Sequence, residues 1–325
     1  MKIVVLSRMP KSYSTRRLVK TARRRGHEVM VADPLDFVPV MSRHAPTLYH
    51  RNRPVDDVDL VIPRIGASMT NYGLAVVRQL DMMGIAVLNN AVAIARSRDK
   101  LRAMQLLTLK DIDVPVTVCA RHPDELDIAL ELVGGPPVIV KLIQGTQGVG
   151  VMIAETKEAA RALLQTLWGM DQELILQQYI AESKGKDLRV IVVGGKVVAA
   201  MRRTASKGEF RANLHRGGKG RKIRLSAELE RIAIEATKVM ALEVAGVDIL
   251  ESKDGPKVLE VNSSPGLEGI EKVTKADVAD AIIAHAEIYA RKRRGRGRGA
   301  FPGKKDKVVA TERRDTDRRS NGRGG

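Results

Sequence analysis

The sequence of 325 residues predicts an α/β protein with an N-terminal parallel layer, two further α+β lobes and a disordered basic tail. Over about the first 95 residues, short β-branched runs alternate with helical segments, which is typical of a parallel sheet covered by helices. Strand pairs joined by glycine turns follow later in the chain. Near the C-terminus the apolar periodicity is lost, so no packed core is expected there.

Composition limits the class of protein. Apolar residues make up 44% of the chain and aromatic residues only 3%, so the cores must be built mainly from aliphatic side chains and Met. The single cysteine, Cys119, excludes a disulfide framework, and because it follows an apolar run we expect it to be a small core residue. The opening MKIVVLSRMP lacks the features of a signal peptide, and no run is long enough for a membrane helix. We therefore expect a soluble, cytoplasmic protein.

The first predicted unit spans residues 1–96 and is the parallel α/β domain. Buried parallel strands read as nearly continuous apolar runs, and helices show apolar residues at a period near four. The predicted strands are Lys2–Ser7, Glu28–Ala32, Leu60–Ile62 and Ile85–Leu88, and the predicted helices are Ser14–Arg25 and Asn71–Met83.

The second predicted unit spans residues 97–187. Ser97 is interpreted as the N-cap of a helix that runs to about Lys110, because a serine side chain can accept a bond from the first turn. The unit's predicted strands are Val114–Val118, Pro137–Leu142, Val149–Ala154 and Leu174–Tyr179, and its other predicted helices are 124–133 and 156–167.

The third predicted unit spans residues 188–291. Two glycines, Gly194 and Gly195, separate β-rich runs and indicate a hairpin, and Asp254-Gly255 indicates another. The predicted strands are Leu188–Val193, Lys196–Met201, Ala245–Glu251 and Lys257–Asn262; a polar loop is predicted at 204–220, and helices at 226–243 and 275–291.

The last segment carries most of the excess charge. Residues 291–325 hold 14 Lys/Arg and 4 Asp/Glu, whereas residues 1–290 hold 42 and 34, so more than half of the net +18 lies in the last 35 residues. This stretch is rich in Gly and Arg and has few apolar residues to bury. We predict that residues 292–325 are disordered.

Three oxygen-bearing side chains are expected on one face of a strand pair. Glu260 and Asn262 lie two apart in an apolar strand, and Asp248 lies in the partner strand. Because side chains alternate along a strand, Glu260 and Asn262 must point the same way. Carboxylates among apolar residues are costly unless paired or metal-bound, and Mg²⁺ prefers oxygen ligands. The alternative is an ordinary solvent-facing strand pair.

A glycine-rich turn follows Lys141, at the end of a predicted strand. The run KLIQGTQGVG, from Lys141 to Gly150, allows backbone N–H groups to approach phosphate oxygens closely. It is neither a P-loop nor a dinucleotide fingerprint, because no Gly-Lys-Ser/Thr is present and a strand follows it. An ordinary hairpin turn is the alternative.

Two further segments carry candidate binding residues. A basic loop suited to phosphate or an anionic substrate contains Arg202, Arg203, Lys207, Arg211, His215 and Arg216. A solvated basic loop or a nucleic-acid patch is the alternative, although only Phe210 could stack on a base. The connector Gln177–Ile180, with Asp187 beyond it, could present groups to a nucleotide. Its alternative is an ordinary linker between domains.

Taken in order, these motifs resemble the ATP-grasp superfamily. More closely, six blocks resemble the ribosomal protein S-six modification enzymes, a bacterial family of α-L-glutamate ligases, and the resemblance runs from Met1 to about Arg291. The blocks are IPRIG, ARSRDKLRAMQLL, VKLIQGTQGVGV, RANLHRGG, AGVDIL and EVNSSPGLEGIEK. The implied fold is an ATP-grasp fold with an N-terminal pre-ATP-grasp domain.

The resemblance implies a site between the two α+β lobes. Lys100 and Lys141 would contact the phosphates of ATP, Gln178 and Tyr179 the adenine, Asp187 the ribose, and Arg211, Ala212 and Asn213 phosphate or metal-bound oxygens. Asp248, Glu260 and Asn262 would hold two Mg²⁺ or Mn²⁺ ions, with Glu260 between them. Gln178 stands where the family often has Glu, so a backbone contact to adenine would survive and a carboxylate contact would not.

The implied reaction adds L-glutamate to the C-terminus of a small-subunit ribosomal protein through an acyl phosphate. Arg202, Arg203 and His215 are candidates for binding acceptor or donor carboxylates. A ligase acting on a small molecule is one alternative, and a ribosome- or RNA-binding factor acting through residues 292–325 is another. We expect no membrane partner, and a homo-oligomer for which a tetramer is one candidate state.

Overall fold

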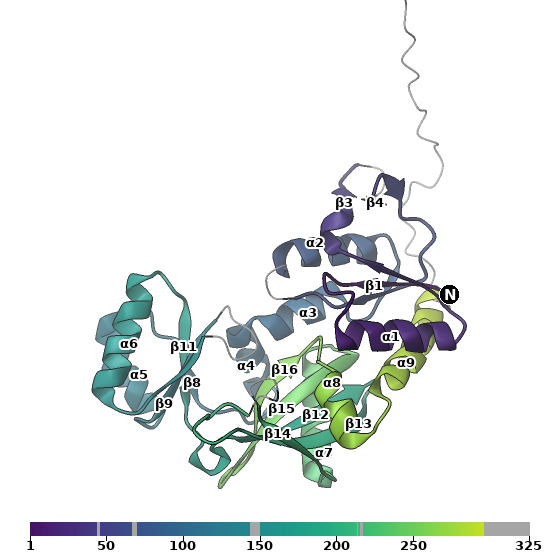
Figure 1. Cartoon of the computed structure of the whole chain (residues 1–325). Coiled ribbons are helices and arrows are strands. Elements are labelled where there is room, and N and C mark those ends of the chain that lie inside the picture. Colours follow the sequence, from purple (N-terminus) through teal and green to yellow (C-terminus); the bar gives the residue numbers. More distant parts are fainter. Residues whose placement is uncertain (44–45, 67–69, 144–149, 213, 215–216, 296–325) are drawn as a thin grey trace, which may run out of the picture.

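The structure, a computed structural model, describes residues 1–43, 46–66, 70–143, 150–212, 214 and 217–295 (Figure 1). Its larger sheets form three bodies. One lobe, drawn in teal and carrying α5 and α6, projects away from the green five-stranded sheet, and the purple N-terminal sheet lies beside that green sheet (Figure 1). The mixed α/β class predicted from the sequence is confirmed.

The N-terminal sheet has the order β2-β1-β6-β7 and is parallel throughout, as predicted. Its strands are β1 (Lys2–Leu6), β2 (Glu28–Ala32), β6 (Leu60–Pro63) and β7 (Ala86–Val87), and its helices are α1 (Tyr13–Arg24), α2 (Thr70–Met82) and α3 (Ala91–Arg98). A small antiparallel sheet, which the sequence did not predict, comprises β3 (Phe37–Val40), β4 (Thr47–His50) and β5 (Arg53–Pro54) and follows the short helix η1 (Pro34–Asp36).

The second sheet is antiparallel with the order β10-β9-β11-β8, and two helices pack on one of its faces (Figure 1). Its strands are β8 (Thr117–Val118), β9 (Val138–Leu142), β10 (Val151–Ala154) and β11 (Leu174–Gln178), and its helices are η3 (Pro123–Glu125), α5 (Leu126–Leu132) and α6 (Lys157–Gly169). The helix α4 (Lys100–Thr108) leads into this lobe from the N-terminal domain.

The expected cap at Ser97 was wrong. Asp99 caps α4, because its side chain accepts a bond from the backbone N–H of Arg102 at 2.9 Å. Ser97 instead lies in the last turn of α3, where its hydroxyl donates to the carbonyl of Ile94 at 3.0 Å. Both side chains can cap a helix, and the break between two helices at Asp99 decides which one does.

The third sheet is antiparallel with the order β14-β13-β12-β15-β16. Its strands are β12 (Lys186–Val193), β13 (Lys196–Thr204), β14 (Lys219–Lys222), β15 (Val244–Ser252) and β16 (Gly255–Asn262); its helices are η4 (Ala181–Ser183), α7 (Ala227–Val239), α8 (Glu268–Thr274) and α9 (Val278–Gly295). Gly194 and Gly195 form the predicted hairpin turn with φ of 57° and 74°. The last two residues of the polar loop predicted at 204–220 belong to strand β14. Helix α8 was not predicted from the sequence.

Helix α9 joins the N-terminal domain to the five-stranded sheet. One core contains Val5 and Leu18 of the first unit, Ile191 of β12, and Ile283 of α9. The first and third predicted units therefore share a core, although each has its own sheet. Helix α9 also continues through Gly295, four residues beyond the predicted boundary at 291, and Arg293 in this extension bonds Asp81 at 2.7 Å.

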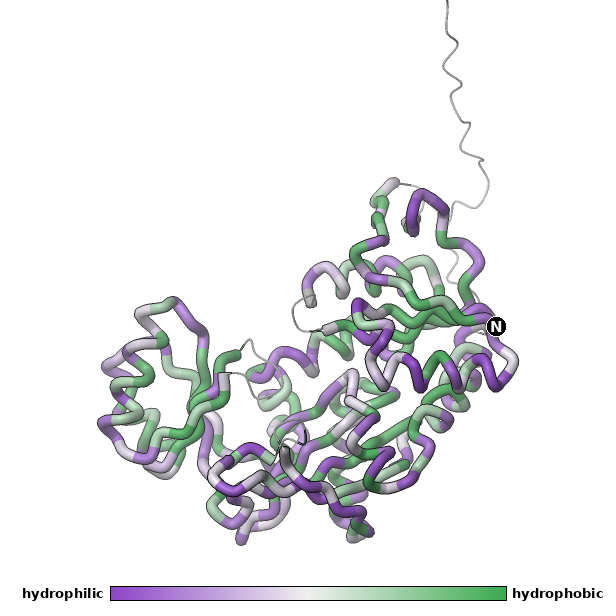
Figure 2. Tube along the Cα trace, viewed as in Figure 1, coloured by the Kyte–Doolittle hydropathy of each residue, from purple (hydrophilic) through white to green (hydrophobic). Residues whose placement is uncertain are grey.

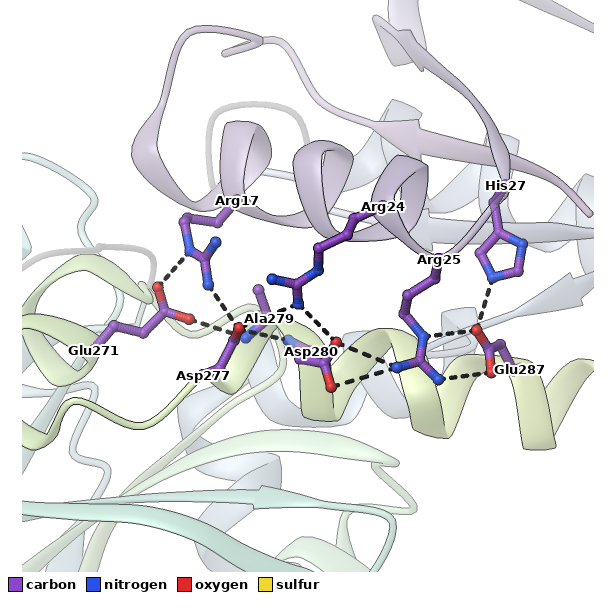
Figure 3. A network of polar contacts seen from close by, with 9 residues as sticks. All are labelled: Arg17, Arg24, Arg25, His27, Glu271, Asp277, Ala279, Asp280 and Glu287. Carbon is purple, nitrogen blue, oxygen red and sulfur yellow. Dashed lines mark hydrogen bonds and ion pairs between the residues drawn. The ribbon is translucent and has the colours of Figure 1, made fainter.

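Charged side chains line the same junction (Figure 3). Arg17 of α1 bonds Glu271 of α8 at 2.9 Å, and Arg25 bonds Glu287 of α9 at 2.8 Å. Arg25, assisted by His27, lowers the pKa of Glu287 to about 2. Because this pKa lies below its ordinary value, the stabilisation is present at neutral pH and is lost as the pH falls toward 2.

The cores are aliphatic, as the composition predicted. Figure 2 shows hydrophobic segments concentrated along the strands, and Phe37 is the one aromatic residue among the described core residues. Cys119 was expected in a core, but it is exposed, because β8 is short and the chain leaves the sheet at that residue. Within the described residues, no helix is long and apolar enough to cross a membrane. The tail prediction falls largely on residues 296–325, which lie outside the described residues.

The shared core can be tested on α9. We expect Ile283→Ala to lower the free energy of unfolding by about 2–5 kcal/mol, because Ile283 is fully buried in this core and truncation leaves a cavity. The matched control is Ile288→Ala on the same helix, where Ile288 is 50% exposed and the change should stay within about 0.5 kcal/mol. Urea denaturation followed by circular dichroism measures both. Equal effects would show that α9 does not hold this core.

Candidate active site

The candidate site begins on β15 and β16. Asp248 lies opposite Glu260 and Gly246 lies opposite Asn262, so the three oxygen-bearing side chains share one face, as alternation predicted. A bulge shifts the register between Asp248 and Ile249. As a result Ile249 lies opposite Val258, and apolar residues of both strands share the other face of the sheet. Asp248 is only 3% exposed, which excludes an ordinary solvent-facing position for this carboxylate.

Arginines from β12 and β13 neutralise the buried carboxylates of this face. Arg189 bonds both oxygens of Asp248, at 2.8 and 2.6 Å. Arg203 donates to Asp248 at 2.8 Å and to both oxygens of Asp187 at 2.6 Å. We call these four residues the buried charge network. It pairs two cations with two anions, which is the condition under which charges can be buried.

The network treats its two carboxylates differently. Burial opposes the ionisation of Asp248, but Arg189 and Arg203 outweigh it and hold the pKa of Asp248 below its ordinary value. Burial raises the pKa of Asp187 to about 6, and Arg203 only partly offsets this. Asp248 is therefore held ionised, which is the form of a carboxylate that can coordinate a cation.

The donor set of this face fits a hard divalent cation. Asp248, Glu260 and Asn262 offer carboxylate and amide oxygens, which Mg²⁺ and Mn²⁺ prefer. Among the described residues no group of three or more His, Cys, Asp and Glu could hold a metal, so Asn262 would have to contribute. The buried Nδ2 of Asn262 has no hydrogen-bond partner among the described residues, so it is available to donate to an acceptor such as a phosphate oxygen, whereas the cation ligand of this amide would be Oδ1.

Two lysines from outside the sheet have pKa values that depend on the charge of Glu260. Burial lowers the pKa of Lys141, on β9, to about 8, and the negative charge of Glu260 opposes the shift. Burial also lowers the pKa of Lys100, at the start of α4, and Glu260 again opposes it. Both lysines therefore lie within electrostatic reach of Glu260. The charge of Glu260, in the third sheet, thus acts on one lysine of β9 and one at the start of α4.

Gln177 is a site residue to which the sequence interpretation assigned no role of its own. The Nζ of Lys141 donates to its Oε1 at 2.5 Å, and its Nε2 donates to Thr117 at 2.8 Å. Gln177 is 2% exposed, so both bonds are shielded from water. The signal was available in the sequence, because Gln177 is a polar residue within the apolar strand β11, which pairs with β9.

The connector residues lie at the C-terminal end of β11, an inner strand of the second sheet. The backbone N–H of Gln178 donates to the carbonyl of Val116 at 2.8 Å, and its side-chain oxygen accepts from Val116 at 3.3 Å. Tyr179 is partly buried, and this burial raises the pKa of its phenol. The side chain and the backbone N–H of Gln178 are therefore both engaged within the sheet.

The basic loop residues do not all gather at the site. Arg203 belongs to the buried charge network, but Arg202, its neighbour in sequence, points to the opposite face and bonds Glu251 at 2.9 Å. Two adjoining hollows of about 570 and 630 Å³ lie there, away from Asp248 and Glu260. Both are lined by Arg202 and Arg221, and the other cations that line one or the other are Lys186, Lys219, Lys222 and Arg224.

The remaining predicted residues follow β13. Arg211 bonds Glu209 at 2.8 Å and lies over the ring of Phe210, at 5.1 Å from its centroid. Ala212 is buried. Asn213 and His215 lie outside the described residues, and so does most of the glycine loop, residues 144–149.

Two neighbouring arginines allow a direct test of the buried charge network. We expect Arg203→Ala to cost about 3–5 kcal/mol of stability, because it leaves the carboxylates of Asp187 and Asp248 without a shared partner. Arg202→Ala on the opposite face should cost about 0–1 kcal/mol, since its pair with Glu251 is partly exposed. Urea denaturation at pH 7 measures both. An Arg203→Ala variant as stable as Arg202→Ala would contradict this account of the network.

The two antiparallel lobes, with lysines of one facing carboxylates of the other, define a nucleotide-binding protein of the ATP-grasp class. The chain belongs to the RimK-like ATP-grasp family: residues 97–286 match the RimK-like ATP-grasp domain, and residues 1–94 match the RimK PreATP-grasp domain. The fold class predicted from the sequence resemblance is thereby confirmed. The ATP-grasp fold binds ATP with Mg²⁺.

Relatives cover nearly the whole chain. A probable α-L-glutamate ligase of Azotobacter vinelandii is 53% identical over 299 residues, which are 92% of this chain and 99% of the relative. One of Ectopseudomonas mendocina is 52% identical over 301 residues, 92% of this chain and 100% of the relative. The ATP-grasp ligase PsnB, solved with a phosphomimetic variant of its minimal precursor, Mg and ADP, superposes with a TM-score of 0.68 at 21% identity, covering 89% of this chain and 98% of that one. This structural similarity to PsnB, at 21% identity, shows that the two chains share a fold.

Proposed function

We propose that this chain, an ATP-dependent α-L-glutamate ligase, adds L-glutamate to the C-terminus of a small-subunit ribosomal protein. The observation that supports this most strongly is 53% identity to probable α-L-glutamate ligases along almost the full length of both chains. The charge of Glu260 acts on both Lys100 and Lys141, and cations near a carboxylate of the candidate metal set fit the ligase chemistry. An acceptor on the ribosome also fits the expected cytoplasmic location.

The reaction has two steps that require no protein nucleophile. An oxygen of the acceptor carboxylate attacks the γ-phosphorus of ATP, the bond to the β-phosphate oxygen breaks, and ADP leaves. The amine nitrogen of glutamate then attacks the acyl carbon, phosphate leaves, and the nitrogen loses a proton. An unactivated carboxylate is a poor electrophile, so the first step supplies the leaving group that the second step needs.

We assign the nucleotide to the junction between the lobes. Lys100 and Lys141 would neutralise its phosphates, and Gln177 would keep the ammonium group of Lys141 in place. The backbone at Gln178 and Tyr179 would meet the adenine. A ribose contact by Asp187 would have to share an oxygen that already accepts from Arg203. The segment from Arg211 to Asn213, which includes Ala212, would contact phosphate or metal-bound oxygens.

The metal set is assigned to the face of β15 and β16. Asp248, Glu260 and Asn262 would hold two divalent ions, Mg²⁺ or Mn²⁺, with Glu260 between them. Such ions would neutralise charge that develops on the transferred phosphoryl group. Arg203 would act by positioning Asp248, because both partners of its guanidinium are carboxylates of the protein. Arg202 and His215 remain candidates for contacts with the acceptor further from the reaction centre.

A mass measurement tests both the function and the metal set. With ATP, Mg²⁺, L-glutamate and the ribosomal protein, we expect a ladder of added glutamyl masses. Glu260→Gln should reduce the rate by at least about 100-fold, because it removes a metal ligand in the position that meets the phosphates. The matched control is Glu230→Gln, an exposed carboxylate in the first turn of α7.

Other outcomes of this measurement separate the alternatives. Radiolabelled glutamate that enters only small molecules would indicate a ligase with a small-molecule acceptor. Full activity of Glu260→Gln, with unchanged dependence on Mg²⁺, would contradict the metal assignment and leave the ligase assignment intact.

A second candidate role rests on the charge of the tail. We propose that residues 292–325 bring the enzyme to ribosomes or RNA, because residues 291–325 hold 14 Lys/Arg and 4 Asp/Glu. This role would coexist with ligation.

The tail proposal predicts a separation of binding from turnover. Because α9 runs to Gly295, the deletion should begin at residue 296 so that the helix is kept. We expect the shortened enzyme to lose salt-dependent ribosome cosedimentation, with turnover on free ribosomal protein within about twofold of the full chain. Unchanged cosedimentation in 0.1 M salt would show that the tail has no such role.

A further inference from the structure

Arg64 lies where the N-terminal domain faces the candidate site. It follows Pro63, the last residue of β6, and its backbone N–H donates to the carbonyl of Leu6 at the end of β1, at 2.8 Å. In parallel sheets, ligands bind at the edge formed by the carboxyl ends of the strands. Arg64 therefore stands at the edge of this sheet where a ligand is expected.

The side chain of Arg64 reaches across to the third lobe. Its Nη2 donates to the carbonyl of Pro265 at 2.9 Å, three residues beyond Asn262 at the end of β16. The hydroxyl of Ser264 donates to the carbonyl of Pro63 at 3.4 Å, so the two segments contact each other on both sides. The guanidinium is thus held beside the loop that follows the strand of the metal set.

The charge of Arg64 has no carboxylate to balance it. Arg17, Arg189 and Arg203 each bond at least one carboxylate, whereas the structure gives Arg64 no ion pair with any described residue. The undescribed residues before 296 include no Asp or Glu, so none of them could supply one. Burial lowers the pKa of Arg64 to about 10, so the group stays charged at neutral pH. Arg64 is half-buried, and a partly buried cation without a counterion is stabilised when an anionic ligand pairs with it.

The surrounding chain connects Arg64 to the nucleotide side of the site. Arg98, in the last turn of α3, donates to the carbonyl of Ile65, the residue after Arg64. Two residues later, Lys100 begins α4 and lies within electrostatic reach of Glu260. Arg64 is therefore connected through Ile65 and Arg98 to the start of α4, and through Pro265 to the loop after the strand that carries Glu260 and Asn262.

We propose that Arg64 binds a carboxylate of the incoming L-glutamate, an inference that rests on the proposed function. Glutamate brings two carboxylates that must be held while its amine attacks the acyl phosphate. Lys100 and Lys141 face the phosphate side, and Arg189 and Arg203 are bonded to Asp248. Arg64 retains a guanidinium without an anion, and its planar fork suits a bidentate carboxylate.

Steady-state kinetics with each substrate varied in turn tests this assignment. We expect Arg64→Ala to raise KM for glutamate by about 30- to 100-fold, because a charged hydrogen-bonded contact is lost. KM for ATP and for the ribosomal protein should stay within about twofold. Arg64→Lys should recover part of the loss, since it restores the charge without the planar fork. The matched control is Arg8→Ala, after the neighbouring strand β1, where Arg8 is exposed and paired with Asp33 at 3.3 Å.

The inference fails if KM for glutamate does not change in Arg64→Ala, or if only KM for the ribosomal protein rises, since the bound carboxylate would then belong to the acceptor. Modification of the wild-type enzyme by phenylglyoxal covers the case in which the variants do not fold. Glutamate added with an ATP analogue should protect Arg64 more than the analogue alone, as read by peptide mass spectrometry. An active wild-type enzyme without such protection overturns the inference. Protection by glutamate in an enzyme that does not modify the ribosomal protein overturns the proposed acceptor instead.

Discussion

Arg203 neutralises two carboxylates that the five-stranded sheet has buried, and the candidate site depends on this pairing. Without a shared partner, Asp187 and Asp248 would be two anions in a site that excludes water. The network also holds Asp248 ionised, while its charge is balanced by Arg189 and Arg203. The ionisation state of Asp248 is therefore set by arginines of two other strands.

A second constraint comes from α9. This helix packs between the N-terminal domain and the third sheet, and its apolar residues belong to one core with both. The ion pairs of Arg17 and Arg25 line the same junction (Figure 3). The two bodies share a core, and Arg64 contacts the loop after β16 across the same junction. The second lobe has a core of its own and is joined to the rest through α4 and the strand that follows Tyr179.

Local rules predicted those elements whose signal is contained in a few neighbouring residues. The hairpin at Gly194 and Gly195 was predicted because two residues with positive φ suit a tight turn between β-rich runs. Strand β14 was missed because Lys219–Lys222 contains no β-branched residue. It is a strand because it pairs with β13, and because Gly220 lets Val273 of α8 pack against it. The same limit explains why the cap at Asp99 was mistaken for one at Ser97.

By itself, the sequence determined that Asp248, Glu260 and Asn262 share one face, because alternation along paired strands is a local property of the backbone. Only the tertiary structure decided that Asp248 would be buried and paired, since Arg189 and Arg203 arrive from strands 59 and 45 residues away in the chain. It also decided which of two adjacent arginines would serve the site and which would face away. Burial and charge compensation depend on what packs above a strand, and that information does not lie within the strand itself.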